Sequence, residues 1–239
     1  MRIAIMASGK GSNLKVILDH ARAGRLDAEP CLVLCNNPEA GALAHAKAAG
    51  VPTWSKSHQG IARADFDAEL LEAIGKSGAE AVILAGYMRL LSPQFIQAYA
   101  GRILNVHPSL LPSFPGVSGM REALDYRVRL AGCTVHFVEE EMDSGSIIIQ
   151  AALPVSQDDT LETLMPRVHA LEHRIYPQAI QWLAQGRLRQ EGRIVWLLPG
   201  KGAQPANGHC PEHARDGGGQ QTGAAGAPQF IASPPLEDF

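Results

Sequence analysis

The fold is decided early in the chain, by the stretch Arg2–Asn13 with the sequence RIAIMASGKGSN. Its first six residues form a short apolar strand pattern, and the glycine- and serine-rich turn after it leads into a helix expected from about Asn13 to Ala23. Glycines let the backbone approach a ligand, and free N–H groups at a helix start favour an anion such as phosphate. A tight turn in which a serine or asparagine caps the helix explains the same residues equally well.

Two familiar nucleotide-binding motifs are excluded at this turn. A P-loop needs glycine at position 4 and serine or threonine at position 11, where Ala4 and Gly11 stand. A dinucleotide fingerprint needs a third glycine at position 14, which is Leu14, and an acidic residue after the next strand, where Asn36 and Asn37 stand. The turn therefore favours a phosphate and argues against NAD.

The rest of the first hundred residues alternates between strand and helix patterns. Further strands are expected at Cys31–Cys35, Val51–Trp54, Ala81–Ala85 and Ile103–Val106. Helices are expected at Gly41–Ala49, around Phe66–Ile74 and at Pro93–Tyr99. This alternation predicts an α/β fold with a mostly parallel sheet and helices on both of its faces.

The pattern changes after Pro115. Cys133–Val138 and Ser146–Val155 are expected to be antiparallel strands, because a short acidic turn joins them. Arg193–Leu198 is expected to be a final edge strand.

A long helix is expected between these strands and that final one. Apolar residues recur every three or four positions over Leu161–Leu183, which is the pattern of a half-buried helix. Asp159 and Glu162 resemble a capping box at its start. Pro177 is expected to kink or interrupt the helix, because proline removes a backbone hydrogen bond.

The C-terminal stretch Pro199–Phe239 has a different composition, with eight glycines and six prolines in 41 positions. Such a segment buries too little apolar surface to offset its ordering entropy, so it is predicted to be mostly disordered. We therefore expect one domain at 1–198 followed by a tail at 199–239.

Composition excludes several classes of protein. The chain has 239 residues with 21 Lys and Arg against 24 Asp and Glu, a net charge of −3, which argues against a nucleic-acid-binding surface. Its apolar runs fall short of the roughly 20 residues of a membrane helix, and four cysteines are too few for a disulfide scaffold. We expect a soluble, cytoplasmic protein with free thiols and no membrane partner. The cluster His209–His213 offers too few ligands in a tail to predict a metal site.

Two polar side chains stand at the end of the strand expected around residue 105. Asn105 and His107 are two positions apart, so both point to the same face at the carboxyl end of the strand, where open α/β sheets place their ligands. An amide donor beside an imidazole can hold a developing oxyanion and move a proton. A hydrogen-bonded core histidine remains the alternative for His107.

The acidic turn Glu139–Gly145 offers four carboxylates in five residues. Most such turns are solvated. If one carboxylate folds back onto His107, it would stabilise the imidazolium; sequence spacing alone leaves both possibilities open.

Together, these segments resemble the phosphoribosylglycinamide formyltransferase family, which are folate-dependent enzymes of purine synthesis. The resemblance runs in order through residues 1–198 and is carried by Ser8–Asn13, Leu84–Ser92, Leu104–Pro112, Gly132–Gly145 and Glu172–Pro177. It implies a Rossmann-like sheet. It also implies transfer of a formyl group from 10-formyltetrahydrofolate, used as a co-substrate, to the amine of phosphoribosylglycinamide, with neither metal nor ATP required.

The resemblance further implies roles for individual residues. The catalytic group would be Asn105, His107 and Asp143, with Asp143 supporting the imidazolium and relaying a proton. The phosphorylated substrate would be held by Gly11, Ser12, Asn13 and Glu172. The folate would be held by Arg63, Met88, Arg89, Leu90, Leu91 and Asn105. The chain departs from many relatives after Pro115, where Val117–Arg121 contains none of their histidines, so altered substrate contacts are expected there.

Two alternatives remain beside this interpretation. A formyltetrahydrofolate deformylase shares the same chemistry but passes the formyl group to water. A non-catalytic module would bind a phosphorylated metabolite through the glycine turn without turnover. The sequence leaves open whether the chain is a monomer or a homodimer.

Overall fold

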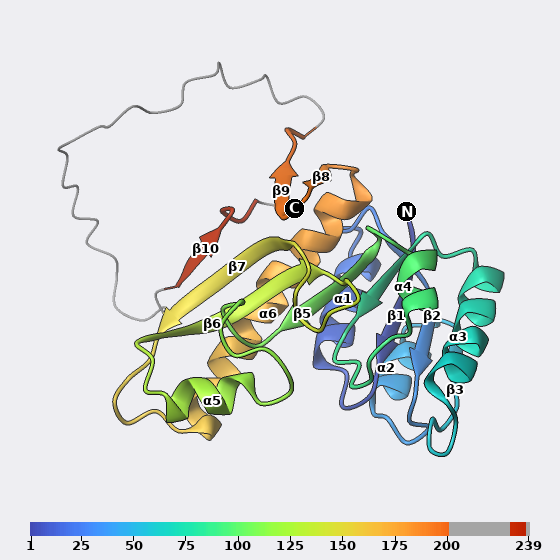
Figure 1. The fold of residues 1–239 in the computed structure, drawn as a ribbon. Coiled ribbons are helices and arrows are strands. Elements are labelled where there is room, and N and C mark those ends of the chain that lie inside the picture. The colour runs from blue at the N-terminus through green and yellow to red at the C-terminus, as the bar shows by residue number, and fades with distance from the viewer. Residues whose placement is uncertain (201–229, 238–239) are drawn as a thin grey trace.

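The computed structural model describes residues 1–200 and 230–237. Its centre is an eight-stranded sheet in the order β10-β7-β6-β5-β4-β1-β2-β3 (Figure 1). Its strands are β1 (Arg2–Ala7), β2 (Glu29–Cys35), β3 (Thr53–Ser55), β4 (Ala81–Leu84), β5 (Ile103–His107), β6 (Leu130–Phe137), β7 (Ile147–Pro154) and β10 (Ile231–Ser233). The helices are α1 (Ser12–Arg22), α2 (Ala42–Ala48), α3 (Arg63–Ser77), α4 (Pro93–Ala98), α5 (Gly119–Asp125) and α6 (Leu161–Ala184).

The sheet has a parallel part and an antiparallel part. The strands from β5 to β3 pair in parallel, whereas β6, β7 and β10 extend the sheet antiparallel to their neighbours. The predicted fold class, a mostly parallel Rossmann-like sheet with antiparallel C-terminal strands, is confirmed.

Helices cover both faces of the sheet because its central strands are apolar on both sides. In β1, Ile3 and Ile5 pack in the cluster that contains the buried residues of α1, α2 and α6. The alternate residues Ala4 and Met6 pack with those of α3 and α4. Successive side chains of a strand point to opposite faces, so a continuous apolar run is the signature of a strand buried on both faces.

The order of the strands places a topological switch beside β1. The chain moves from β1 to β2 on one side and later returns to β4 on the other side. Open α/β sheets bind ligands outside the carboxyl ends of the strands at such a point. The turn after β1 and the turn after β4 meet at this point. The Ser8 N–H donates to Gly86 O at 3.1 Å, and the Met88 N–H donates to Ser8 Oγ at 2.8 Å.

The long helix α6 differs from expectation in two details. It continues as one helix through Pro177, so the interruption that the sequence allowed there does not occur. Most residues from Leu171 to Trp182 are buried, and this packing offsets the hydrogen bond that proline cannot make. The capping box also lies one residue later than the predicted pair Asp159 and Glu162. It is formed by the N-cap Thr160, whose N–H donates to Thr163 Oγ1 at 3.0 Å. Despite its 24 residues, neither α6 nor another helix within the described ranges is apolar enough to cross a membrane.

A small hairpin follows α6. The strands β8 (Leu188–Glu191) and β9 (Ile194–Leu197) pair only with each other, so the strand predicted at Arg193–Leu198 belongs to a separate two-stranded sheet and not to an edge of the main one. The short helix α5 was not predicted either; its seven residues carry too few periodic positions for a pattern to emerge.

The C-terminal stretch also differs from expectation at residues 230–237, which lie on the folded core. Strand β10 pairs with β7 through Ile231, Ala232 and Ser233. The Glu237 carboxylate pairs with Arg187 at 2.6 and 2.8 Å, and the Arg174 guanidinium lies 4.4 Å above the ring of Phe230. Backbone pairing and these side-chain contacts offset the ordering entropy that the composition suggested would dominate. Residues 201–229, to which the prediction of disorder also applies, lie outside the described residues.

Candidate active site

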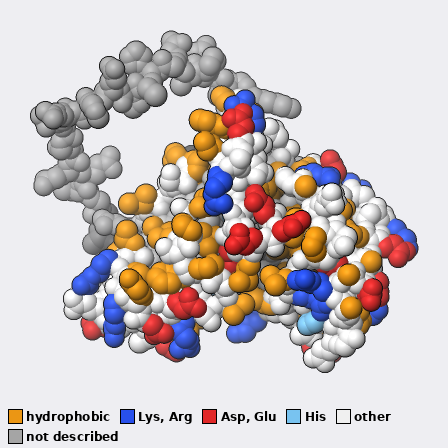
Figure 2. Space-filling view, viewed as in Figure 1, with side chains coloured by type: hydrophobic (Ala, Val, Ile, Leu, Met, Phe, Trp, Pro, Cys, Tyr) orange, Lys and Arg blue, Asp and Glu red, His pale blue; other side chains and the backbone are white. Residues whose placement is uncertain are grey.

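A cavity of about 380 Å³ opens at the carboxyl ends of β4 and β5. Three segments form most of its lining, at residues 86–91, 105–108 and 138–143. Unusually exposed hydrophobic side chains surround it, namely Met88, Leu90, Val117 and Met142. Figure 2 shows acidic side chains beside hydrophobic ones near the middle of the viewed face. The cavity combines this apolar rim with the carboxylates of Glu139–Glu141 and Asp143 in its lining.

Asp143 and His107 face each other in the wall of this cavity. The segment 138–146, which we name the Asp143 loop, brings Asp143 Oδ2 to 3.5 Å from His107 Nδ1. The same oxygen accepts a hydrogen bond from the Gly116 N–H at 2.7 Å. His107 Nε2 lies 3.0 Å from Phe114 O, and a carbonyl oxygen only accepts, so Nε2 carries a hydrogen and Nδ1 faces Asp143. The structure therefore brings together the two residues that sequence spacing could not connect.

A second histidine, His136, lies next to this pair. Its Nδ1 is 2.7 Å from Phe137 O, which fixes the hydrogen on Nδ1. Burial lowers the pKa of His136, so the neutral ring leaves Nε2 as an acceptor. The Asn105 amide Nδ2 lies 3.2 Å from this Nε2 and donates to it. His136 Nε2 is also 3.7 Å from Asp143 Oδ1.

The sequence motifs assign no role to His136, although the pairing of its strand with that of Asn105 connects the two residues. Asn105 and His136 are direct partners on the antiparallel strands β5 and β6. Side chains of directly opposed residues lie on the same face of a sheet. The signal was the register of two strands, and register cannot be read from either strand alone.

The glycine turn has the geometry of an anion site. Gly11 is the N-cap of α1 with φ +78°, and no side chain caps the helix, so the alternative in which Ser12 or Asn13 is a cap does not hold. A Cβ on Gly11 would lie 2.7 Å from the Ala42 Cα, so only glycine fits. The first N–H groups of α1 are left free of intrahelical partners, and this arrangement suits a phosphate.

Glu172 lies across from this turn, on α6. It is buried, and its Oε2 accepts a hydrogen bond from Asn13 Nδ2 at 2.8 Å. Burial raises the pKa of Glu172 to about 7, while the bond from Asn13 acts in the opposite direction. The Asn13 Oδ1 atom is buried and has no partner among the described residues. The predicted substrate residues Gly11, Ser12, Asn13 and Glu172 are therefore close together in space.

The residues predicted to hold a folate separate into two groups. Five of them line the cavity, namely Met88, Arg89, Leu90, Leu91 and Asn105. Arg63, the exposed first residue of α3, does not line it.

The Arg89 guanidinium contacts the segment that runs from His58 to Phe66. It donates to His58 O at 3.3 Å and to Ile61 O at 3.2 Å, and it lies 5.0 Å from the centre of the Phe66 ring. The sequence could not indicate this, because the carbonyls that hold Arg89 belong to a distant loop. The side chain fastens the segment just before Arg63.

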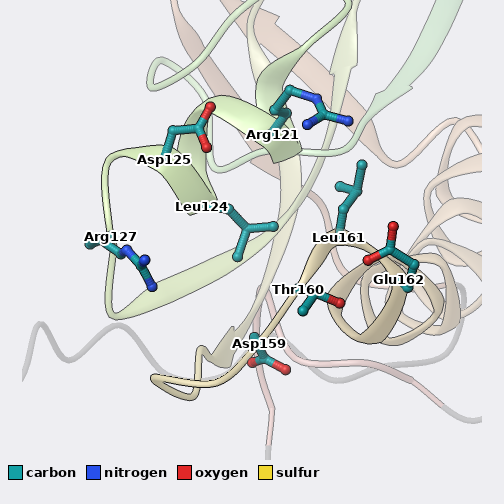
Figure 3. A pocket seen from close by; sticks show the side chains of 8 residues that line it. All are labelled: Arg121, Leu124, Asp125, Arg127, Asp159, Thr160, Leu161 and Glu162. Carbon is teal, nitrogen blue, oxygen red and sulfur yellow. The ribbon is translucent and has the colours of Figure 1, made fainter.

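A second cavity of about 380 Å³ lies between α5 and the start of α6 (Figure 3). Its lining mixes charges of both signs, including Arg121 and Glu162. Asp159, also in its lining, is engaged by Arg167 at 2.7 Å. None of the predicted site residues, all of which are described, lines this cavity, so the candidate active site is the cavity beside His107.

Metal-ligating side chains do not gather in the described ranges 1–200 and 230–237: no group of three or more His, Cys, Asp or Glu is arranged to hold an ion there. The segment His209–His213 lies outside the described residues.

Comparisons with known proteins point to one family. A family described as Formyl transferase matches residues 1–180. The chain is 40% identical over 198 residues to phosphoribosylglycinamide formyltransferase of Escherichia coli (strain K12), which covers 82% of this chain and 93% of that protein. It is 43% identical over 199 residues to the trifunctional purine biosynthetic protein adenosine-3 of Bos taurus, covering 82% of this chain. The chain spans only 20% of the length of this trifunctional relative.

A solved structure gives the same result for the fold. The structure of glycinamide ribonucleotide transformylase 1 from Symbiobacterium toebii matches with a TM-score of 0.82 and 46% identity, covering 83% of this chain and 94% of that chain. The resemblance carried by five segments of the sequence is thereby confirmed for the family and for the sheet.

Proposed function

Because this chain belongs to the formyl transferase family, we propose that it transfers a formyl group from 10-formyltetrahydrofolate to the amine of 5-phosphoribosylglycinamide in purine synthesis. The observation that carries the proposal is the pair formed by His107 and Asp143 at 3.5 Å, with Asn105 beside it, in the wall of one cavity. These groups suit a reaction in which a negative oxygen develops and a proton moves.

The first step makes a bond between the acceptor amine and the formyl carbon. The intermediate is tetrahedral and carries a negative oxygen. Asn105 donates one amide hydrogen to His136, which leaves the other for this oxygen. A single such donor typically contributes roughly 10²–10³ in rate.

His107 contributes a positive charge when it is protonated on both ring nitrogens. Its Nε2 hydrogen is held by Phe114 O. The 3.5 Å between Nδ1 and Asp143 Oδ2 is longer than a strong hydrogen bond, so the Nδ1 hydrogen remains available to the developing oxyanion.

Asp143 completes the transfer by moving a proton. Its carboxylate accepts the proton that the attacking amine releases, through a water molecule, and delivers it to the folate nitrogen as the bond between that nitrogen and the formyl carbon breaks. The amine hydrogen is thus transferred to the leaving nitrogen, and no oxidant, reductant or metal takes part.

The two substrates would occupy adjoining parts of the switch point. The backbone of Gly11, Ser12 and Asn13 would hold the acceptor's phosphate, and Glu172 would contact its polar groups. The exposed hydrophobic side chains around the cavity, Met88 and Leu90 among them, favour a flat, partly apolar group such as the folate ring. Arg63 would reach the acidic end of the folate from outside the cavity.

The experiment is a measurement of tetrahydrofolate released from 10-formyltetrahydrofolate, with and without phosphoribosylglycinamide. Release that requires the acceptor, together with formylated product, is the expected result. Release without the acceptor would replace the proposal with hydrolysis of the folate. Binding of the acceptor with no release in either arm would leave a metabolite-binding module.

A further inference from the structure

The β8–β9 hairpin lies outside the main sheet, yet residues of β8 and of the hairpin turn are bonded to the Asp143 loop. Gln190 Nε2 donates to Glu139 Oε1 at 3.1 Å and to Ser146 Oγ at 3.0 Å. Arg193 donates to Ser144 O at 3.1 Å. The hairpin thus holds the loop on both sides of Asp143.

The contact at Ser146 is buried. The residue is only 2% exposed, and its hydroxyl donates to Gly192 O at 3.0 Å while accepting from Gln190. A buried hydroxyl left without partners would cost about 1–3 kcal/mol. Both partners of this hydroxyl come from the hairpin, so the Ser146 side chain at the end of the Asp143 loop depends on the hairpin for its hydrogen bonds.

The loop needs such support because its backbone is strained. Asp143 has φ +53°, a left-handed conformation that costs a residue other than glycine on the order of 1–3 kcal/mol. Gly145 passes so close to Phe137 O that a Cβ would not fit. Strained conformations persist only where the surrounding structure holds them.

The base of the hairpin is itself closed by Arg187. Its Nε donates to Leu198 O at 2.7 Å, and its two terminal nitrogens bond to Glu237. The hairpin is therefore anchored at one end to the C-terminal segment and bonded at the other to the Asp143 loop.

We propose that the β8–β9 hairpin is a positioning element for the reaction, and that Gln190 and Arg193 are positioning residues that hold the Asp143 carboxylate toward His107. The inference rests on the proposed function for its kinetic part. Its structural part, the hold on the loop, is independent of which substrate the protein uses.

The test compares Gln190→Leu and Arg193→Ala with a matched control, all in the full chain. Arg189→Ala is the control, since Arg189 lies on the same hairpin and pairs with Glu191 at 3.2 Å. A displacement of a catalytic group by about 1 Å can reduce turnover by up to about 10²-fold. We therefore expect kcat to fall roughly 10- to 100-fold in Gln190→Leu and Arg193→Ala. The KM for the phosphorylated acceptor and the melting temperature should change little, and Arg193→Lys should restore part of kcat.

A double-mutant cycle separates positioning from a general effect on the fold. If Arg193 acts through Asp143, then Arg193→Ala should cause no further loss of kcat in a chain that already carries Asp143→Ala. An equal loss in both backgrounds would overturn the inference.

Hydrogen–deuterium exchange of the substrate-free protein tests the hold on the loop directly. Amides of residues 139–146 should exchange faster in Gln190→Leu and Arg193→Ala, and at the wild-type rate in Arg189→Ala. Unchanged exchange in all three variants would overturn the inference. A wild-type protein without formyl transfer would contradict only the proposed function, because exchange is read without substrates.

Discussion

The two halves of the candidate site are built in different ways. The glycine turn of Ser8–Asn13 is contiguous in sequence, and its shape follows from one glycine and the start of one helix. The Asp143 loop is held by groups from three places distant in sequence, namely His107, Gly116 and the β8–β9 hairpin with Gln190 and Arg193. A local site should fail abruptly when its backbone is blocked, whereas a supported site should weaken step by step as its supports are removed.

This difference also explains why the glycine turn can be predicted from the sequence, whereas the position of the Asp143 loop cannot. A glycine at a strand-to-helix junction carries its own conformational information. The position of Asp143 depends on hydrogen bonds whose donors lie far away in sequence, as in the bond between Arg193 and Ser144 49 positions apart. Substitutions in the two halves should therefore differ in how strongly they affect turnover and stability.

The most severe effect on the supported half should come from His107→Ala. Removing a group that stabilises a developing oxyanion typically costs about 10²–10³ in rate, so kcat should fall by that factor. Calorimetric titration with phosphoribosylglycinamide should show binding close to wild type, because the glycine turn is untouched. His45→Ala, at a half-buried position of α2, is the control. A variant with full activity would remove His107 from the mechanism.

Across from the glycine turn, Glu172→Gln should change how the free energy of unfolding depends on pH. Burial raises the folded pKa of Glu172 from 4.5 to about 7. Between these values the unfolded chain releases a proton that the native protein keeps, so this group makes the native state less stable as pH rises through the window. Glutamine cannot ionise, so above pH 7 the variant should be more stable than wild type by on the order of 3 kcal/mol, and near pH 4.5 the two should be equal.

Urea denaturation at several pH values measures this difference. Glu162→Gln is the control on the same helix, because the pKa of Glu162 is lowered by its hydrogen bond to Thr160, which gives a weak dependence of the opposite sign. If the difference in unfolding free energy between Glu172→Gln and wild type did not vary with pH, the raised pKa of Glu172 would be contradicted.

Gly11→Ala tests the abrupt failure expected of the local half. The new Cβ would lie 2.7 Å from the Ala42 Cα at φ +78°, so the turn must deform, at a cost of about 1–3 kcal/mol. We expect a higher KM for the phosphorylated acceptor and a melting temperature lower by roughly 2–4 °C per kcal/mol.

Gly9→Ala is the matched comparison within the same turn, since a methyl group at Gly9 would meet no atom of a non-adjacent residue within 4 Å. Steady-state kinetics and thermal melting on both variants give the result. Equal effects at the two glycines would show that the turn is not fixed by its backbone at Gly11.

The smallest effect should come from shortening the chain to residues 1–200. The truncation removes β10 and Glu237, and it leaves the buried Trp182 Nε1 without the carboxylate that lies 3.1 Å away. An unpaired buried donor costs about 1–3 kcal/mol, so the melting temperature should fall by several degrees.

The kinetics of the same truncated chain test whether the C-terminal segment also helps to hold the Asp143 loop. We expect kcat to stay near wild type, because Gln190 and Arg193 keep their own bonds to the loop. A melting temperature equal to wild type would mean that residues 230–237 add nothing to the fold. Glu191→Gln, at an exposed hairpin carboxylate, is the control.

Much of the fold was predictable because buried strands and amphipathic helices leave periodic patterns. The strand at β4 is entirely apolar, and Asn105 and His107 share a face by spacing alone. Those features depend on neighbours in sequence.

The features that escaped prediction depend on contacts between distant residues. Strand β10 is three residues long and owes its place to β7 and to Arg187. The position of the Arg89 guanidinium depends on the carbonyls of residues 58 and 61. Helix α6 passes through Pro177 because its surroundings bury it. In each case tertiary packing outweighs local propensity.

The late position of β10 has a consequence for how the protein is made. The outer edge of β7 acquires its partner only when Ile231 has been added, and 33 residues (198–230) separate that point from the end of β9. At about 5–20 residues per second, a ribosome needs roughly 2–7 s for this stretch. During that interval a nascent chain can already fold its sheet while β7 still offers unpaired backbone groups to neighbouring chains. Crowding of ribosomes on one message should therefore be the condition under which this protein is most prone to aggregate.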